Sequence, residues 1–366
     1  MPTADPQITI AVCTFNGEQR LPHVLKALAA QRTPEPGFLE VVVVDNASTD
    51  GTAAVAARSW QGPRESLRVV REPKQGVSHA RVRAFSEARG RVVGFVDDDN
   101  IPAPQWALRA VEVMDERPKV GACGGHNEAE LDTQEPAWFS RFARLYAVGP
   151  QGDRAGDVTD DRGFLWGAGL CVRRSAWEQL WAAGFSPLTT SRRGAQLLSG
   201  EDTELCLALR LAGWRLWYEP CLQMKHRIAE TRLSWRHLCL LSRGDGASSV
   251  LLDPYHFALA GPAARVPARI RRRWGWRVLA AGRNVLRQGL LPPRAGFWRG
   301  EGDRRVLVAN WEWGRLQMLL RLRGGYDAAT KRVERLQVQL QSRGECGEKL
   351  GDLACRAHGI QRKDAG

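Results

Sequence analysis

The sequence lacks any long hydrophobic run. No stretch approaches the roughly 18 consecutive apolar residues that a membrane-spanning helix requires, so we expect no membrane span. It also lacks cysteine pairs of the C-x-x-C type, and we expect no signal peptide. The eight cysteines are scattered along the chain, which predicts reduced, mostly buried thiols and a cytoplasmic location.

The first 260 residues lack an excess of either charge. Residues 261–366 hold 23 Lys and Arg against nine Asp and Glu, and they account for all of the net charge of +13. An arginine-rich tail meets the first criterion for a nucleic-acid-binding protein, which is one alternative for this chain. The sequence shows no recognition motif for nucleic acid, however, so we expect no such partner.

Apolar segments alternate with helical patterns in the first part of the chain. The expected strands are 8–12, 41–44, 67–70 and 92–96, and the expected helices are 20–31, 49–59 and 78–88. This order predicts an α/β fold with a Rossmann-like, mostly parallel central sheet flanked by helices on both faces. Ligands of such sheets bind at the carboxyl ends of the strands, where this chain places polar residues.

Three consecutive carboxylates end the fourth expected strand. Along an extended chain, Asp97 and Asp99 project to one side and Asp98 to the other. Carboxylate oxygens here suit Mg²⁺ or Mn²⁺, with phosphate oxygens of a nucleotide diphosphate completing the coordination shell. The alternative is an ordinary solvated strand end, in which Asn100 and Pro102 make a turn.

The other three strand ends carry candidate nucleotide-binding residues. These are Thr14, Phe15 and Asn16 after the first strand, Asp45 after the second and Arg71 after the third. Asp45 could accept a hydrogen bond from a pyrimidine base or a ribose, although residues 45–51 equally suit a turn and a helix N-cap. Arg71 could meet phosphate or base, or be a solvated surface charge.

Four motifs occur in a telling order and spacing: residues 14–17, 43–51, 76–81 and 95–99. Together they resemble those of family 2 glycosyltransferases, which have the GT-A fold, over about residues 7–240. The resemblance implies a nucleotide-sugar donor, most often a UDP-sugar, a divalent cation (Mn²⁺ or Mg²⁺), and transfer with inversion at the anomeric carbon.

The same resemblance implies roles for individual residues. Asp45 matches the base-binding aspartate, and Asp97, Asp98 and Asp99 match the motif that binds metal and diphosphate, with Asp99 as the direct metal ligand. Arg81 is available for phosphate. Val82 departs from the family pattern, which commonly has Asn there, so a polar contact is absent or supplied elsewhere.

The second half of the chain supplies the catalytic candidates. Gly167 and Gly169 form a small-residue turn that resembles the family segment lining the donor sugar and acceptor, although a structural turn is the competing interpretation. Glu201 and Asp202 open an expected helix, where negative charge is favourable in any case. In the resembled family this pair provides the general base, which we assign to Asp202, with Glu201 as second choice.

One histidine and one missing motif complete the catalytic half. His226 matches a family position that ligates the cation or contacts pyrophosphate, although a lone histidine is more often a packed structural residue. The chain lacks the Gln-x-x-Arg-Trp motif of the processive synthases in this family. We therefore expect one or a few sugars to be added per encounter.

Residues beyond about 260 differ in character. Apolar residues recur at helical spacing among arginines over 264–291 and again over 304–322. Such basic helices suit an anionic membrane surface, where a lipid-linked acceptor would lie, or they pack on the catalytic domain. We expect a catalytic domain over 1–260, a basic helical extension over 261–342 and a disordered tail over 343–366.

The expected function follows from these parts. We expect an inverting, metal-dependent glycosyltransferase that acts on a glycan or lipid-linked acceptor in cell-surface polysaccharide or glycoconjugate synthesis. The resemblance implies a cytoplasmic enzyme, and a peripheral position on the inner face of the plasma membrane is the alternative. A nucleotidyltransferase of related fold is the other alternative, but the loop Cys13–Glu18 lacks the glycine-rich, basic character usual there.

Overall fold

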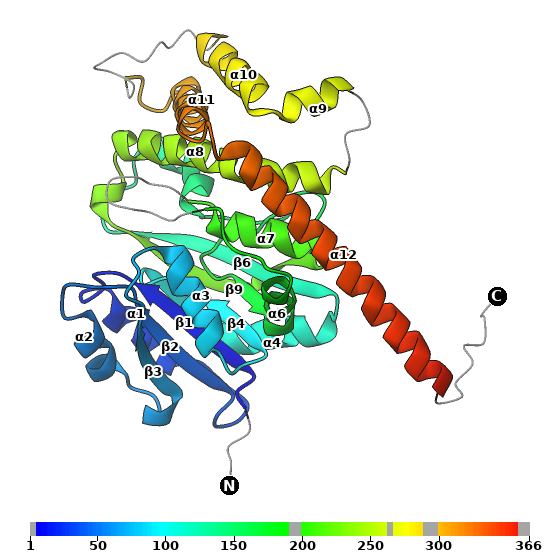
Figure 1. The fold of residues 1–366 in the computed structure, drawn as a ribbon. Helices are drawn as coiled ribbons and strands as arrows, with labels where there is room; N and C mark the ends of the chain where they lie inside the picture. The colour runs from blue at the N-terminus through cyan, green and yellow to red at the C-terminus, as the bar shows by residue number, and fades with distance from the viewer. Residues whose placement is uncertain (1–4, 190–198, 262–265, 288–298, 358–366) are drawn as a thin grey trace.

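The computed structural model describes residues 5–189, 199–261, 266–287 and 299–357, and it shows an α/β architecture around one sheet (Figure 1). The strands run in the order β3-β2-β1-β4-β8-β6-β9-β5, with β7 paired to β9. Their bounds are β1 (Ile8–Thr14), β2 (Leu39–Asp45), β3 (Leu67–Arg71), β4 (Val92–Phe95), β5 (Asn100–Pro102), β6 (Val120–Leu131), β7 (Gly156–Asp157), β8 (Cys171–Arg173) and β9 (Arg215–Ile228).

The four expected strands form a parallel half-sheet, which confirms the predicted fold class. The strands β3, β2, β1 and β4 pair in parallel, and β6 pairs with β9 in parallel. The short strands β5, β7 and β8 are antiparallel to their neighbours. The carboxyl ends of β1, β2 and β3 therefore lie at one edge, with Thr14, Asp45 and Arg71 side by side in register.

Helices cover both faces of the sheet because the strands are apolar on both sides. Ile8, Ile10 and Val12 of β1 face a core made with α1 and α4, whereas Ala11 faces a second core made with α3, α6 and α7. The helices have the bounds α1 (Leu21–Ala29), α2 (Thr52–Ser59), α3 (Val77–Glu87), α4 (Trp106–Glu116), α5 (Phe139–Phe142), α6 (Arg174–Ala182) and α7 (Glu201–Leu211).

Five further helices follow the sheet: α8 (Trp235–Leu259), α9 (Val266–Arg272), α10 (Trp274–Arg287), α11 (Arg304–Arg321) and α12 (Tyr326–Ala357). The helix α8 lies over α7 and the β6–β9 side of the sheet; α11 packs on α8, and α10 packs on α11 at the edge of the molecule (Figure 1). None of the described helices is both long and apolar enough to cross a bilayer.

The extension agrees with the expected helices and differs in the tail. The segment 304–322 matches α11 within one residue, and 264–291 contains α9 and α10, which are separated at Arg273. Residues 343–357, which we expected to be disordered, continue α12, and residues 358–366 lie outside the described ranges. The helix α8 was not predicted from the sequence, and it holds Pro254 within its last turns.

Candidate functional site

A cavity of about 540 Å³ opens at the carboxyl ends of β1 and β4, beside the start of α7. Nine predicted site residues line it: Phe15, Arg81, Asp97, Asp98, Asp99, Gly167, Glu201, Asp202 and His226. They come from segments far apart in the sequence, so the fold brings together the acidic strand end, the glycine turn and the Glu-Asp pair. The Asn100 amide donates to the Asp97 carbonyl at 3.0 Å, so the turn that we gave as the alternative is present, and a metal-binding role for Asp97–Asp99 stays a prediction.

Five predicted residues lie behind the cavity or at its margin rather than in its wall: Thr14, Asn16, Asp45, Arg71 and Gly169. The Thr14 hydroxyl donates to Oδ2 of Asp98 at 2.5 Å, so it orients a residue that does line the cavity. Arg71 is exposed at the end of β3. The amide of Gly169 donates to the carbonyl of Phe95 at 3.0 Å, and its φ of +79° accounts for the glycine.

Asp45 and Asn16 both hold loop backbone in place. Asp45 is buried, and its Oδ1 accepts a hydrogen bond from the Ser48 amide at 3.0 Å. Oδ1 of Asn16 accepts from the Thr49 amide at 2.9 Å. The turn chemistry that we gave as the alternative for residues 45–51 is therefore present, and a nucleotide-binding role for Asp45 stays a prediction.

Two arginines that the sequence analysis missed partly neutralise the acidic strand end. Nε and Nη2 of Arg20 donate to the two carboxylate oxygens of Asp98 at 2.9 and 2.8 Å. Nη1 of Arg232 donates to Oδ2 of Asp99 at 3.0 Å, and Nε2 of His226 lies 3.5 Å from the same oxygen. Sequence spacing could not predict these ion pairs. They form because the fold brings the start of α1 and the segment after β9 next to the acidic strand end.

The surroundings of Asp99 and Asp97 shift the pKa of the two carboxyls in opposite directions. Burial disfavours the ionised form of Asp99, but the hydrogen bond and charge of His226, with Arg232 and Arg20, lower the pKa of its carboxyl. Burial and the neighbouring Asp99 raise the pKa of the Asp97 carboxyl, against the attraction of Arg81. Asp97 has no ion pair with any described residue. Asp97 thus lacks a close counter-charge in this site.

The donors present suit part of the shell of a divalent cation. Among the described residues, no three His, Cys, Asp or Glu side chains are grouped as a metal site. Asp97, Asp99 and His226 nevertheless face one cavity, and their oxygen and nitrogen donors are types that Mg²⁺ and Mn²⁺ accept. A cation would also balance the charge at Asp97. These residues therefore fit a cation whose remaining positions are filled by phosphate oxygens and water.

Arg81 is a buried cation facing the same cavity. Its guanidinium lies 5.2 Å from the ring centre of Phe95, and Nη1 has no hydrogen-bond partner among the described residues. Burial opposes its charge, but Glu201, Asp97 and Asp202 outweigh this and raise its pKa. A buried N–H group without a partner is costly, so Arg81 is suited to bind an anionic ligand such as phosphate.

Asp202 is held in one orientation by backbone groups. Its Oδ2 accepts from the Gly167 amide at 2.6 Å, and its Oδ1 accepts from the Thr203 amide at 2.7 Å. A Cβ at position 167 would lie 2.4 Å from Nη2 of Arg81, so a larger residue there would require this guanidinium to move. The glycine turn and the Glu-Asp pair are therefore one structural unit.

Two further groups near the site were not predicted. Glu204, one turn after the pair, is fully buried and accepts from the Leu188 and Thr189 amides at 2.6 and 2.8 Å and from the Tyr255 hydroxyl at 2.9 Å. Trp166 lines the cavity with Arg144 and Arg162 near its ring, at 6.0 and 4.5 Å from the ring centre. Glu204 holds the start of α7 against α8, which helps to position Asp202.

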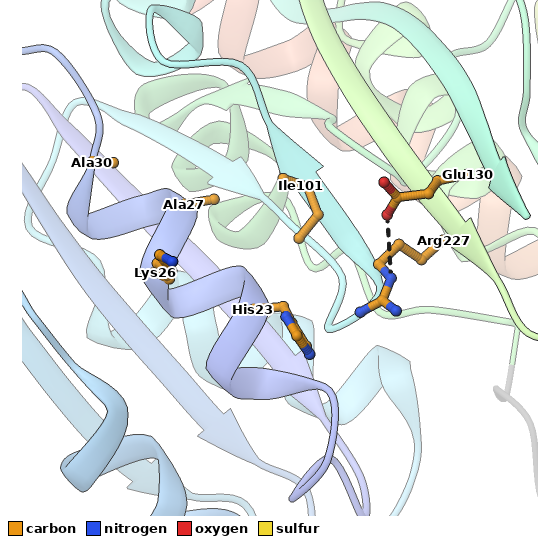
Figure 2. Close-up of a pocket in the computed structure, with 7 residues that line it drawn as sticks. All are labelled: His23, Lys26, Ala27, Ala30, Ile101, Glu130 and Arg227. Carbon is orange, nitrogen blue, oxygen red and sulfur yellow. Dashed lines mark ion pairs between the residues drawn. The ribbon is translucent and has the colours of Figure 1, made fainter. Parts of the chain in front are cut away.

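A second cavity of about 540 Å³ lies between α1 and the strands β5, β6 and β9, where none of the predicted residues lies. Figure 2 shows His23 of α1 facing Ile101 and Arg227, with Glu130 beside Arg227 at 3.2 Å. Glu130 pairs with Arg227, and Lys26 of α1 adds a further positive charge to the wall of this cavity.

Comparison with known proteins indicates one class of enzyme. Residues 9–181 match the family described as Glycosyl transferase family 2. The glucosyl-dolichyl phosphate glucuronosyltransferase of Haloferax volcanii is 23% identical over 254 residues, which are 68% of this chain and 77% of that protein. The succinoglycan biosynthesis protein ExoM of Rhizobium meliloti is 27% identical over 235 residues, 64% of this chain and 71% of that protein.

Among solved structures, the mannosyltransferase PcManGT from Pyrobaculum calidifontis, in complex with GDP-Man and Mn²⁺, is 21% identical, with a TM-score of 0.49 over 93% of this chain and 87% of that one. The family match and the glycosyltransferases among the sequence relatives define the chain as a glycosyltransferase. These comparisons support a family 2 glycosyltransferase, and the mostly parallel sheet agrees with the expected α/β fold.

Proposed function

We propose that this enzyme transfers a sugar from a nucleotide-diphosphate donor, with a UDP-sugar as the first candidate, to a hydroxyl of a glycan or lipid-linked acceptor. The transfer inverts the anomeric carbon and serves polysaccharide or glycoconjugate synthesis. The observation that carries the proposal is the shared cavity, in which Asp97, Asp99 and Arg81 face Asp202.

The acidic strand end and the arginines would hold the diphosphate. Asp99, Asp97 and His226 are the residues that would bind a divalent cation, which supplies positive charge beside the leaving phosphate when bound. Arg81 offers a buried N–H group to a phosphate oxygen. Phe15, Thr14 and Asp45 would then lie toward the nucleoside, because they follow the neighbouring strand ends.

Asp202 would act as the general base. As the acceptor hydroxyl attacks the anomeric carbon, its proton passes to a carboxylate oxygen of Asp202, the new glycosidic C–O bond forms, and the bond to the diphosphate oxygen breaks. The Gly167 and Thr203 amides fix the Asp202 carboxylate and leave lone pairs on both oxygens for the acceptor. Single displacement of this kind inverts the configuration of the anomeric carbon.

The proposal is tested by measuring nucleoside diphosphate release from UDP-glucose, UDP-N-acetylglucosamine, UDP-glucuronate and GDP-mannose, with alkyl glycosides as acceptors. We expect one donor to be consumed, and Asp202→Asn to lower kcat by about 100-fold or more with donor affinity retained. Glu201→Gln should keep most of the activity. Exposed Asp153 provides the matched control, Asp153→Asn, which should behave as the wild type.

Full activity of Asp202→Asn would remove Asp202 from the role of base. A Glu201→Gln variant that alone loses activity would transfer the role to Glu201. Retention of configuration in the product, read by NMR, would contradict the single displacement.

A further inference from the structure

Exposed apolar side chains gather on the two helices farthest from the sheet. Ile270 of α9 and Trp276, Leu279 and Leu286 of α10 are 45, 47, 68 and 67% exposed. They make up half of the large hydrophobic side chains that are exposed within the described residues, although these helices are a small part of the chain. Figure 1 places α9 and α10 at one edge of the molecule, beyond α11 and α8.

The exposed residues of α10 do not belong to the side of the helix that packs on the rest of the protein. Ala281 of α10 is buried against α11 together with half-buried Trp274 and Val278, and Val285 on the same side of the helix is also buried. At 3.6 residues per turn, Trp276, Leu279 and Leu286 lie on the opposite side of the helix. The helix therefore has one apolar stripe for the protein core and a second one that faces outward.

The segment that carries the outward stripe has positive charges only, although Glu312 of α11 accepts a hydrogen bond from Asn284 of α10 at 3.1 Å. Arg271 of α9, Arg273 between the two helices, and Arg283 and Arg287 of α10 are exposed, and the last two fall between or beside the exposed leucines. The sequence has no Asp or Glu between Asp253 and Glu301. We name the exposed apolar residues Ile270, Trp276, Leu279 and Leu286, with these four arginines, the basic face.

We propose that the basic face docks on the surface of an anionic lipid bilayer. Apolar side chains of this size would enter the boundary between headgroups and acyl chains, while the arginines contact lipid phosphates. A nucleic acid would use the arginines but would leave Leu279 and Leu286 exposed to water. An acidic protein partner would not require α9 and α10 to lack carboxylates altogether. A uniformly negative surface would, because any carboxylate on the basic face would be repelled by it.

The basic face is connected rigidly to the catalytic cavity through α8. Arg277, on α10, donates to Asp253 of α8 at 2.6 Å, and Leu241 and Asp245 of the same helix line the cavity. Docking would therefore hold the cavity at a fixed orientation to the bilayer. This placement suits an acceptor carried on a membrane lipid, but the docking itself does not depend on which sugar is transferred.

The test is sedimentation of the full chain with sucrose-loaded vesicles of phosphatidylcholine, alone or mixed two to one with phosphatidylglycerol. We expect binding to the mixed vesicles at least about tenfold stronger than to phosphatidylcholine alone, and weaker as salt is added. The double variant Leu279→Ala/Leu286→Ala should bind the mixed vesicles about tenfold or more weakly, because each leucine loses apolar area that would enter the bilayer.

Matched controls come from exposed apolar residues elsewhere. Trp181 of α6 is 52% exposed, close to Trp276, so Trp181→Ala should leave binding unchanged where Trp276→Ala weakens it. Val338→Ala on α12 is the control for the leucines. Thermal unfolding of each variant shows whether the fold is intact, and nucleotide binding is followed in parallel.

Three results would overturn the docking. The wild type would fail to bind the mixed vesicles at low salt, or Trp276→Ala and the double leucine variant would bind as tightly as the wild type. A single-stranded RNA oligomer that bound more tightly than the vesicles, with no effect of the leucine variant, would assign the arginines to nucleic acid instead. A wild-type protein that bound the vesicles but no nucleotide would contradict the proposed function and would still support the docking.

Discussion

At the scale of single residues, some charged groups of the site have partners of opposite charge and others do not. Arg20 and Arg232 each bind one carboxylate of the acidic strand end, while Asp97 and the Nη1 group of Arg81 have no such partner in the described structure. Unpartnered groups of opposite sign in one cavity match a ligand that carries both a cation and phosphate oxygens.

Cys13 lies in the wall of this cavity and is predicted to be chemically inert. Burial, opposed by Arg81 and reinforced by Asp97, Asp98 and Glu201, raises the pKa of its thiol to about 12. At pH 8 only about one Cys13 side chain in ten thousand would be ionised, and the thiolate is the form that reacts. Iodoacetamide should therefore leave Cys13 unmodified, as read by peptide mass spectrometry, and labelling should rise only as pH approaches that pKa.

Cys221 is exposed and serves as the internal control, since it should be labelled at pH 8. Labelling of Cys13 at the rate of Cys221 in the folded protein would show that the thiol is not shielded, and that the electrostatic account of the cavity is wrong at this residue.

At the scale of elements, α8 organises the second half of the molecule. Two glycines let it approach α11 closely: a Cβ on Gly246 would lie 1.9 Å from the Trp311 carbonyl oxygen, and one on Gly314 would lie 1.9 Å from that of Arg243. Further along α8, the buried Asp253 accepts from Arg277 of α10, Arg315 of α11 and Tyr326 of α12 at 2.6, 2.9 and 3.0 Å. One carboxylate thus joins three helices of the extension.

Replacing this carboxylate should loosen the extension. Asp253→Asn would leave two partly buried arginines without their counter-charge, at a cost of about 3 kcal/mol in the free energy of unfolding. Chemical denaturation followed by circular dichroism measures the change, with exposed Asp153→Asn as the control. An unchanged unfolding midpoint would mean that the extension is held by its apolar contacts alone.

At the scale of the whole molecule, the chain divides into an acidic site and a basic edge joined by one helix. The residues up to about 260 form the sheet and the cavity, and α8 at their end carries both cavity residues and the Asp253 cluster. Charge follows the same division, since all of the net charge of +13 belongs to residues 261–366. The molecule is therefore suited to bind a metal and nucleotide at one place and a negative surface at another.

The sequence predicted what depends on local pattern. Strand ends in parallel sheets meet at one edge, so Asp97–Asp99 could be placed near Thr14 and Asp45, and α11 follows from apolar spacing alone. The partners of the acids could not be predicted, because Arg20 and Arg232 reach them only through tertiary packing. The helix α8 escaped prediction because Gly244, Gly246 and Pro254 weaken a helical pattern that contacts with α11 stabilise.

The account is tested most directly by calorimetric titration of UDP, GDP, CDP and TDP into the full chain, with and without Mn²⁺, for the wild type, Asp99→Asn and the control Asp153→Asn. We predict that one nucleotide binds the wild type and the control only when Mn²⁺ is present, and that Asp99→Asn weakens this binding at least about tenfold. Binding of no nucleotide under any condition, or equal binding by Asp99→Asn, would contradict the assignment of this cavity to a metal-bound nucleotide sugar.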